Sequence, residues 1–395
     1  MVQPRPDYDV VVLGAGAAGM MCAMTAGARG RRVLLLDHLP QAGAKILISG
    51  GGRCNFTNEH AQPERFLSAN PRFCTGALRR YTAADFIALV QRHGIPYHEK
   101  TLGQLFCDGS ARAIVAMLLQ ECAVAGVEMR LGQAVTEVAR ADRFRIETGG
   151  QTVYSASLVL ATGGLSIPKM GATGFSHDLA RQFGLPVTAL RPGLVPLTFG
   201  GDMLGLMRPL SGVALPVVAA SGRHSFPEAM LFTHRGLSGP AILQASSLWR
   251  EGEALRVDIL PGTDARALLL ARKRARPRAE ARTVLSEVLP ARLAQALAAA
   301  HLPPGNLADL PDRMLGRLGE MLNGWDLRPD GTEGYAKAEV TLGGVDSRAL
   351  SSKTMEAASV PGLFVVGEAV DVTGWLGGYN FQWAWSSGWC AGMAA

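Results

Sequence analysis

Residues 8–37 read YDVVVLGAGAAGMMCAMTAGARGRRVLLLD, and this stretch decides the fold class. Tyr8 to Leu13 is rich in β-branched apolar residues, as expected of a buried parallel strand. Ala17 to Ala28 follows as a predicted helix, and Arg32 to Asp37 as a second strand. Two parallel strands joined by a helix form a βαβ unit, so the sequence predicts an α/β protein that opens with a Rossmann-like domain.

The loop after the first strand carries the fingerprint G-x-G-x-x-G from Gly14 to Gly19. In this motif the first glycine permits a tight turn, the second lets a pyrophosphate approach the backbone, and the third allows close packing of helix on strand. Asp37, at the end of the second strand, is expected to accept hydrogen bonds from an adenosine ribose. A purely structural glycine turn is the alternative. The nucleotide contacts predicted here are Gly14, Ala15, Gly16, Ala17, Ala18, Gly19 and Asp37.

A segment near the C-terminus distinguishes FAD from a nicotinamide dinucleotide. Leu363 to Val366 is a short apolar strand that runs into Gly367-Glu368-Ala369-Val370-Asp371. A carboxylate here can reach a polyol such as the ribitol of FAD, which a nicotinamide dinucleotide lacks. Gly374 to Asn380 is a glycine-rich turn before a helix expected from Phe381, whose first amides could stabilise negative charge on a reduced flavin. The FAD contacts expected here are Gly367, Glu368, Asp371, Gly378, Tyr379 and Asn380.

Two further stretches are dense in glycine, which suits close approach of the backbone to a ligand. Gly50 to Asn58 reads GGGRCNFTN, and Ala161 to Gly164 reads ATGG. Arg53 could pair with a phosphate or a substrate anion. Cys54 has no second cysteine within the next few residues, so a packing role is favoured over a redox disulfide. The cofactor contacts expected from these two stretches are Gly52, Arg53, Asn55, Ala161, Thr162, Gly163 and Gly164. Lys45 and Val135, which lie outside them, are also expected to contact the cofactor.

Between these stretches the sequence predicts helices over Thr82 to His93 and Ser110 to Ala125, each begun by a capping hydroxyl. Short alternating stretches then predict a β-meander at Ala134 to Ala139, Arg143 to Glu147 and Gln151 to Tyr154. A separate buried strand is predicted at Ser157 to Ala161. These elements belong to the same domain as the fingerprint.

Composition divides the chain into three parts. Residues 1–190 and 336–395 are expected to form one split cofactor domain. Proline punctuates short β-rich stretches in residues 191–262 and 324–335, which predicts an inserted β-domain without continuous helices. Residues 263–323 are rich in Ala, Leu and Arg at helical spacing and predict a small helical subdomain.

Together these motifs resemble those of the BaiN-like flavoproteins, also described as the aminoacetone-oxidase family of FAD-binding enzymes. The matching strings span nearly the whole chain, at residues 14–19, 48–55, 161–164, 232–240 and 377–384. The resemblance implies an FAD domain of the two-dinucleotide-binding type, interrupted by a β-barrel-like domain that carries a helical insert. It also implies an FAD-dependent oxidoreductase, without indicating its substrate.

We expect bound FAD to accept a hydride from one partner and to pass it to another, a small-molecule substrate. No second G-x-G-x-x-G occurs in the sequence, so a nicotinamide donor, NAD(P)H, would dock transiently. Reduction of an activated double bond is favoured slightly over oxidation of an amine or alcohol, because some relatives in the resembled family are named for reduction. The catalytic candidates are Arg53, His234 and Asn380. His234 could shuttle a proton near neutral pH, although a structural role is favoured.

The alternative class of function is an RNA-modifying enzyme or a redox-sensing FAD-binding module. Its only support is a basic run from Arg272 to Arg282. No aromatic residue interleaves with these charges, so a solvated helix face is favoured and nucleic-acid binding is not expected. The net charge of +6 favours anionic partners only mildly, and a dinucleotide pyrophosphate already meets that preference.

Composition also indicates the cellular setting. The six cysteines include no C-x-x-C pair and are read as reduced thiols, and the N-terminus lacks the pattern of a secretory signal, so a cytoplasmic protein is expected. Val10 to Ala28 carries no charge, but its glycines favour a strand that turns into a helix over a membrane span. Neither a membrane segment nor a metal site is expected.

Overall fold

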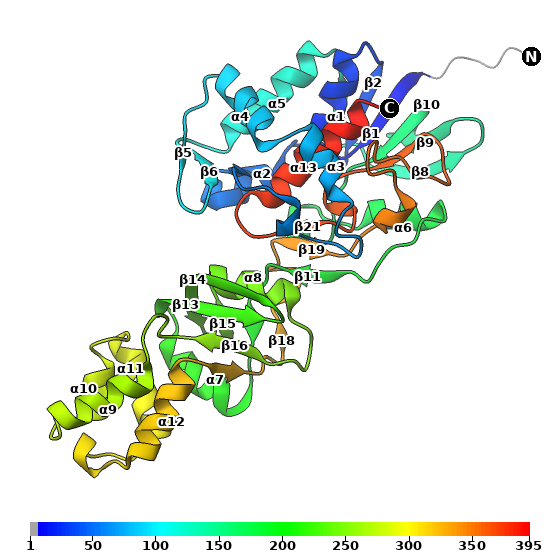
Figure 1. Cartoon of the computed structure of the whole chain (residues 1–395). Helices are drawn as coiled ribbons and strands as arrows, with labels where there is room; N and C mark the ends of the chain where they lie inside the picture. The colour runs from blue at the N-terminus through cyan, green and yellow to red at the C-terminus, as the bar shows by residue number, and fades with distance from the viewer. Residues whose placement is uncertain (1–6) are drawn as a thin grey trace, which may run out of the picture. The chain divides into compact units, whose positions relative to one another are not determined.

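The computed structural model describes residues 7–395, which form two compact units. Unit 1 contains the residues up to Arg191 together with Val340–Ala395, and unit 2 contains Pro192–Glu339 (Figure 1). Unit 1 therefore contains both the beginning and the end of the described chain.

A seven-stranded sheet forms the centre of unit 1, in the order β7-β2-β1-β10-β9-β8, with β20 beside β10. Val10, Val11 and Val12 have no exposed surface, which explains why their stretch reads as a buried strand. Leu363 of β20 lies opposite Leu158 of β10, so the C-terminal segment rejoins the first domain as predicted. The parallel strands are β7 (Glu128–Leu131), β2 (Val33–Asp37), β1 (Tyr8–Leu13), β10 (Gln151–Leu160) and β20 (Leu363–Val365).

The predicted meander consists of β8 (Val135–Arg140), β9 (Phe144–Thr148) and the first half of β10. The sequence predicted a separate strand from Ser157, and this prediction is wrong because β10 continues without a break. Ser155 pairs with a residue on each side, in β1 and in β9, so the polar residues in this strand do not interrupt the sheet.

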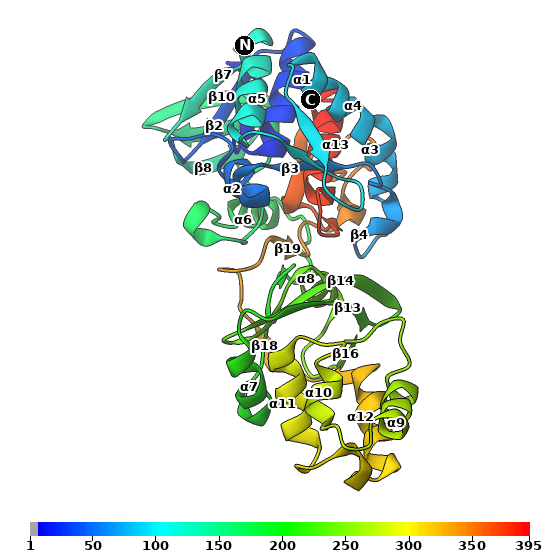
Figure 2. The same cartoon turned by 90° about the vertical axis from the view of Figure 1, so that its left-hand side faces the viewer.

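Helix α1 (Ala17–Ala28) packs against α13 (Tyr379–Gly392), and Figures 1 and 2 both show the two helices side by side. Their close approach depends on glycine, because a Cβ on Gly388 would lie 2.4 Å from the carbonyl oxygen of Ala18. Helix α13 begins two residues before the predicted Phe381. Gly378 precedes the helix with a left-handed φ of +93° that glycine adopts readily.

The hydroxyl of Thr82 caps helix α4 (Ala83–Arg92) as predicted, and Asp85 completes a capping box. Helix α5 (Arg112–Val124) begins two residues after the predicted Ser110, whose hydroxyl accepts a hydrogen bond of 3.2 Å from the Arg112 amide. The other elements of unit 1 are α2 (Ala44–Ile48), α3 (Cys74–Arg80), α6 (Phe175–Gln182), β3 (Asn55–Asn58), β4 (Phe66–Leu67), β5 (Tyr97–Glu99), β6 (Gln104–Cys107), β19 (Val340–Leu342) and β21 (Thr373–Gly374).

Unit 2 contains a seven-stranded antiparallel sheet in the order β17-β16-β13-β14-β15-β12-β18. Within residues 192–339, no strand pairing joins β17 to β18, so the closure of a barrel is not observed. These strands are β12 (Leu197–Thr198), β13 (Ala214–Ser221), β14 (His224–Thr233), β15 (Gly236–Ser238), β16 (Leu255–Asp258), β17 (Trp325–Leu327) and β18 (Gly331–Thr332).

Helices also occur in unit 2. Two of them, α7 (Gly201–Met207) and α8 (Pro240–Leu248), lie where the sequence predicted β structure alone. Pro240 occupies the first position of α8, where its missing N–H costs no hydrogen bond, so this proline begins a helix. The predicted helical subdomain contains α9 (Ala265–Ala275), α10 (Ala281–Leu285), α11 (Ala291–His301) and α12 (Asp312–Leu322), which lie together in Figure 2.

Candidate functional site

Four loops of unit 1 lie at one edge of its central sheet. They follow β1, β2, β10 and β20, and because these strands are parallel their carboxyl ends share that edge. Open α/β sheets bind ligands at this edge. The loops contain the fingerprint Gly14–Gly19, the residues after Asp37, the stretch Ala161–Gly164 and the segment Gly367–Asp371.

The three glycines of the fingerprint have different surroundings. A Cβ on Gly14, whose φ is +108°, would lie 2.5 Å from the carbonyl oxygen of Ala161. A Cβ on Gly19 would lie 1.8 Å from the carbonyl oxygen of Gly14. At Gly16 a Cβ would meet no atom within 4 Å, directly before the first turn of α1. Packing therefore requires Gly14 and Gly19, whereas Gly16 leaves open space where a pyrophosphate would meet the helix amides.

Asp37 stabilises the fingerprint loop through hydrogen bonds to its backbone. Its carboxylate accepts hydrogen bonds from the backbone amides of Ala15, at 2.7 Å, and Leu39, at 2.8 Å. Only 12% of the side chain is exposed. The carboxylate thus fixes the strand-to-helix turn, a role that the sequence did not indicate beside the expected ribose contact.

We expect Asp37→Ala to weaken FAD binding roughly tenfold, because two backbone amides lose their acceptor and the glycine loop loses its support. Asp37→Asn keeps one side-chain acceptor and should bind FAD with intermediate affinity. Fluorescence titration of the apoprotein, from which FAD has been removed, measures both dissociation constants. An unchanged constant for Asp37→Ala would reject this role.

Glu368 lies at the centre of a polar network that joins three of the loops. Its carboxylate accepts hydrogen bonds from the Lys45 ammonium at 2.7 Å, the Ser166 hydroxyl at 2.8 Å and the Thr341 amide at 2.9 Å. Burial by itself raises the pKa of Glu368, but the Lys45 charge and these hydrogen bonds outweigh burial and hold the pKa below its ordinary value. Gly164 must lack a side chain here, since a Cβ would lie 2.4 Å from the Thr341 hydroxyl.

The stretch Gly50–Asn58 meets the N-terminus of α13. Thr57 donates a hydrogen bond of 2.6 Å to Gln382, and the Asn58 amide donates one of 2.8 Å to the Gly377 carbonyl. Asn55 donates to Gln104, while its buried Oδ1 accepts no hydrogen bond from residues 7–395. That free acceptor lies beside Gly378, where helix amides begin. The pair suits the polar edge of a flavin ring, which carries both donors and acceptors.

The three catalytic candidates have different settings. Arg53 is exposed and directly follows the glycines at residues 50–52. No salt bridge joins its guanidinium to an acid within residues 7–395. Asn380 uses its side chain to close a turn: Oδ1 accepts from the Gly374 amide at 2.8 Å, and Nδ2 donates to the Gly374 carbonyl at 2.9 Å. His234 is exposed in the turn between β14 and β15 of unit 2. Asn380 therefore serves to position the turn.

Other expected contacts lie in the same part of unit 1. Asp371 is buried and accepts a hydrogen bond of 3.0 Å from the Ala69 amide, and burial raises its pKa. Val135 is the first residue of β8. Cys54 is buried, which raises its pKa to about 12. No cysteine lies within a few residues after Cys54 along the chain, but β6 brings Cys107 close enough to contribute to the raised pKa.

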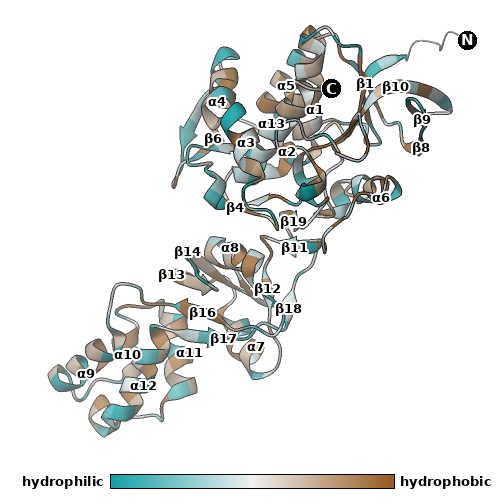
Figure 3. Ribbon diagram, turned by 45° about the vertical axis from the view of Figure 1, so that its right-hand side comes forward, coloured by the Kyte–Doolittle hydropathy of each residue, from teal (hydrophilic) through white to brown (hydrophobic). Residues whose placement is uncertain are grey.

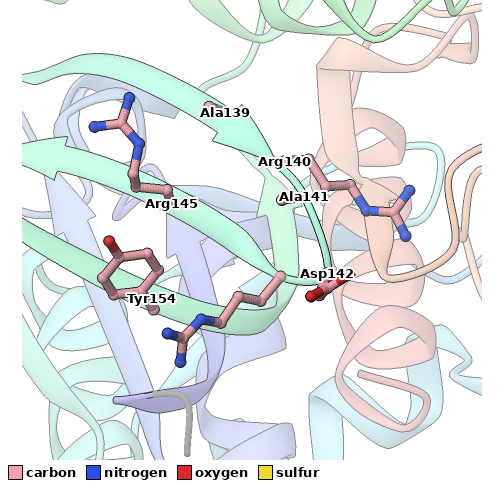
Figure 4. Close-up of a pocket in the computed structure, with 7 residues that line it drawn as sticks. Ala139, Arg140, Ala141, Asp142, Arg145 and Tyr154 are labelled. Atoms are coloured by element: carbon pink, nitrogen blue, oxygen red, sulfur yellow. The ribbon is translucent and has the colours of Figure 1, made fainter. Parts of the chain in front are cut away.

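The surface also carries a hollow of about 370 Å³ on the meander, away from these loops (Figure 4). Two of its arginines interact with other residues of the meander, and a third, Arg140, donates a hydrogen bond to the Pro361 carbonyl. Arg143 lies 4.2 Å from the centre of the Tyr154 ring, and Arg145 pairs with Glu137 and Glu147. The hollow is therefore separate from the candidate cofactor site. It is lined by Ala139, Arg140, Ala141, Asp142, Arg143, Arg145 and Tyr154.

Known proteins similar to this chain include three relatives that match it along nearly its whole length. The ribosomal RNA dihydrouridine synthase of Escherichia coli (strain K12) is 51% identical over 388 residues, with 97% of each chain covered. The protein of the same name from Haemophilus influenzae is 43% identical over 391 residues, again with 97% of each chain covered. The 3-dehydro-bile acid delta(4,6)-reductase of Clostridium scindens is 28% identical over 410 residues, covering 97% of this chain and 98% of its own.

Among solved structures, the 3-ketosteroid-delta4-(5alpha)-dehydrogenase from Rhodococcus jostii RHA1 has a TM-score of 0.53 to this chain. The alignment covers 100% of this chain and 98% of that one at 17% identity, so the likeness is one of fold alone. A family model described as the HI0933-like protein Rossmann domain matches residues 8–394, which is consistent with the resemblance to BaiN-like flavoproteins. The chain therefore belongs to the family of HI0933-like proteins with a Rossmann domain.

Proposed function

We propose that this chain is an FAD-dependent reductase that saturates a carbon–carbon double bond conjugated to a carbonyl, and that its substrate is a uridine of ribosomal RNA. NAD(P)H, docking transiently, is the proposed source of the hydride. Because ribosomal RNA resides in the cytoplasm, the proposal also places the chain there.

The observation that carries the cofactor assignment is the contrast among the fingerprint glycines. Only Gly16 faces open space, directly before the amides of α1. This is what a bound diphosphate requires, and a structural turn would not need it. At the other end of the site, the free Oδ1 of Asn55 lies beside the first amides of α13. The two features suit the two ends of one FAD molecule.

The proposed reaction adds two hydrogens across the C5=C6 bond of the uracil ring. FAD, when bound, supplies the hydride chemistry. The hydride enters at C6, negative charge develops on the C4 carbonyl oxygen, and a proton enters at C5. A guanidinium stays charged at all physiological pH values, so Arg53 fits the role of stabilising that oxygen and not that of proton donor. The amides at the start of α13 would favour negative charge on a flavin ring placed against them.

The choice of uridine over a small molecule rests on the relatives. Two of them, at 51% and 43% identity over 97% of the chain, are named as ribosomal RNA dihydrouridine synthases. The sequence alone favoured a small-molecule substrate, and these names reverse that order. The second candidate is a small cyclic enone, supported by the name of the bile acid reductase at 28% identity. Both substrates contain the same conjugated double bond, so the proposed chemistry is common to them.

The test combines flavin reduction with substrate turnover. We expect NADH or NADPH to bleach the yellow holoenzyme under anaerobic conditions. Unmodified ribosomal RNA should then restore the colour and gain two hydrogen atoms at one uridine, detected by mass spectrometry of its nucleosides. A steroid enone is the parallel substrate. Reoxidation by the enone without any dihydrouridine would overturn the RNA proposal and leave the reductase proposal standing. Failure of both reductants and both substrates would overturn the reductase proposal.

A further inference from the structure

The helical part of unit 2 holds most of the net charge of the chain. Residues 263–323 contain ten Lys and Arg against six Asp and Glu, a net charge of +4 out of +6 for the whole sequence. The sequence favours a solvated helix face for its basic run. The structure shows which of these charges are paired and which are not.

Much of the basic run is neutralised locally. Glu287 pairs with both Arg272, at 3.2 Å, and Arg276. Arg282 pairs with Glu280. These ion pairs join α9 to the segment after α10, or α10 to its N-cap residue, so Arg272, Arg276 and Arg282 offer little free charge to a partner.

The outer surface of α9 and α12 is different. These two helices pack so closely that a Cβ on Gly319 would lie 2.4 Å from the Arg266 backbone. Lys273 of α9 bridges to Asp312 of α12 at 2.7 Å, and Arg266 bridges to Glu320 at 2.6 Å. The two bridges fix the helices antiparallel. Their exposed sides consequently form one continuous surface.

Three exposed arginines on this surface form no salt bridge with an acid among residues 7–395, and we call them the basic face: Arg274, Arg313 and Arg317. Arg274 lies near enough to Asp312 to contribute to lowering the pKa of that carboxyl, after the larger effect of Lys273. Arg313 directly follows Asp312, and Arg317 lies one helical turn further along α12. Figure 3 shows hydrophilic segments on both helices.

We propose that the basic face of α9 and α12 docks the phosphate backbone of structured RNA. This inference rests on the proposed function, because it names a surface that holds the proposed substrate. Arginine suits this role through its planar set of donors, which matches the geometry of phosphate oxygens. Residues 265–323 contain no Phe, Tyr or Trp, so the face lacks a platform for stacking bases. It therefore binds phosphates without reading sequence, while selection of the uridine occurs elsewhere.

The test replaces the three arginines together, as Arg274→Gln, Arg313→Gln and Arg317→Gln in the full-length holoenzyme. Glutamine has a similar helix propensity to arginine and keeps a polar amide, but it is shorter and carries no charge. The matched control replaces Arg31, Arg79 and Arg92, three exposed arginines of unit 1, by glutamine and causes the same change in net charge. Filter binding with unmodified ribosomal RNA transcribed in vitro gives the dissociation constant at several salt concentrations.

We expect the basic-face variant to bind RNA at least tenfold more weakly. The slope of the logarithm of its binding constant against the logarithm of the salt concentration should become shallower by roughly two to three. The control variant should match the wild type. Bleaching of the flavin by NAD(P)H should be unchanged in all three proteins, which shows that unit 1 is intact. Equal RNA affinity and equal salt dependence in the variant and the wild type would overturn the inference.

Dihydrouridine formation separates this inference from the proposed function. If the wild type forms dihydrouridine and the basic-face variant does so with the same KM, RNA docks elsewhere and only the inference fails. If the wild type binds RNA through the basic face but never forms dihydrouridine, the inference stands and the proposed substrate fails. A raised KM with an unchanged kcat in the variant supports both.

Discussion

The variant Gly16→Val should fold and yet be colourless. Its added side chain points into space that contains no protein atom within 4 Å, so the folded chain accommodates it. The same space is where the diphosphate of FAD would lie, so we expect affinity for FAD to fall at least about 100-fold, or about 2.7 kcal/mol. Valine before the first turn of α1 costs about 1 kcal/mol in capping. Absorbance at the flavin bands and far-ultraviolet circular dichroism measure the two effects separately.

Gly19→Val is the contrasting variant. Its Cβ would lie 1.8 Å from the carbonyl oxygen of Gly14, which is backbone and cannot move aside. We expect the free energy of unfolding of the stripped protein to fall by about 3 kcal/mol or more. If Gly16→Val instead retained stoichiometric FAD, the diphosphate would have to lie somewhere else.

The second large effect is expected at Glu368. Glu368→Ala leaves the Lys45 ammonium and the Thr341 amide without their acceptor. The side chain of Lys45 is only 33% exposed and that of Glu368 only 21%. Removing one partner of a buried ion pair costs several kcal/mol, and partial exposure reduces this to about 2 kcal/mol. Urea denaturation measures the loss. Glu137→Ala, which breaks a more exposed pair with Arg145, is the control and should cost less than about 1 kcal/mol.

The same pair gives a pH dependence with a defined sign. The pKa of Glu368 is lowered in the folded protein, so the unfolded chain binds its proton more tightly. The stabilisation is therefore complete above the unfolded pKa, about 4.3, and is lost as the pH falls through the lower folded pKa. Glu368→Ala should lack this part of the acid sensitivity. A wild type and a variant that lose stability in parallel below pH 5 would contradict the assignment.

Local sequence was sufficient for the elements whose signals lie within a few residues. The βαβ opening, the fingerprint and the capping hydroxyl of Thr82 all follow from spacing along the chain. The expected start of α13 was two residues late, because the helix signal there was hidden by Gly377 and Gly378, which usually mark a turn. The expected break before Ser157 failed because pairing on both sides of β10 outweighs a weak local signal.

Contacts between distant residues were beyond the reach of the sequence. Lys45 and Glu368 were each expected near the cofactor, but nothing in either motif indicated that they pair with each other across 323 positions. Ser166 and Thr341 complete that network without belonging to any recognisable motif. Asn380 was a catalytic candidate, and only its hydrogen bonds to Gly374 assign its side chain to the support of a turn.

Glycine spacing and strand hydrophobicity are properties of neighbouring residues, so the Rossmann-like opening of this chain could be predicted from the sequence. Only the folded chain shows which glycine of the fingerprint faces open space, which carboxylate has its pKa lowered by Lys45, and which arginines of the helical part form no salt bridge within residues 7–395. The physical reason is that steric contact, pKa and net charge depend on atoms brought together from remote parts of the chain.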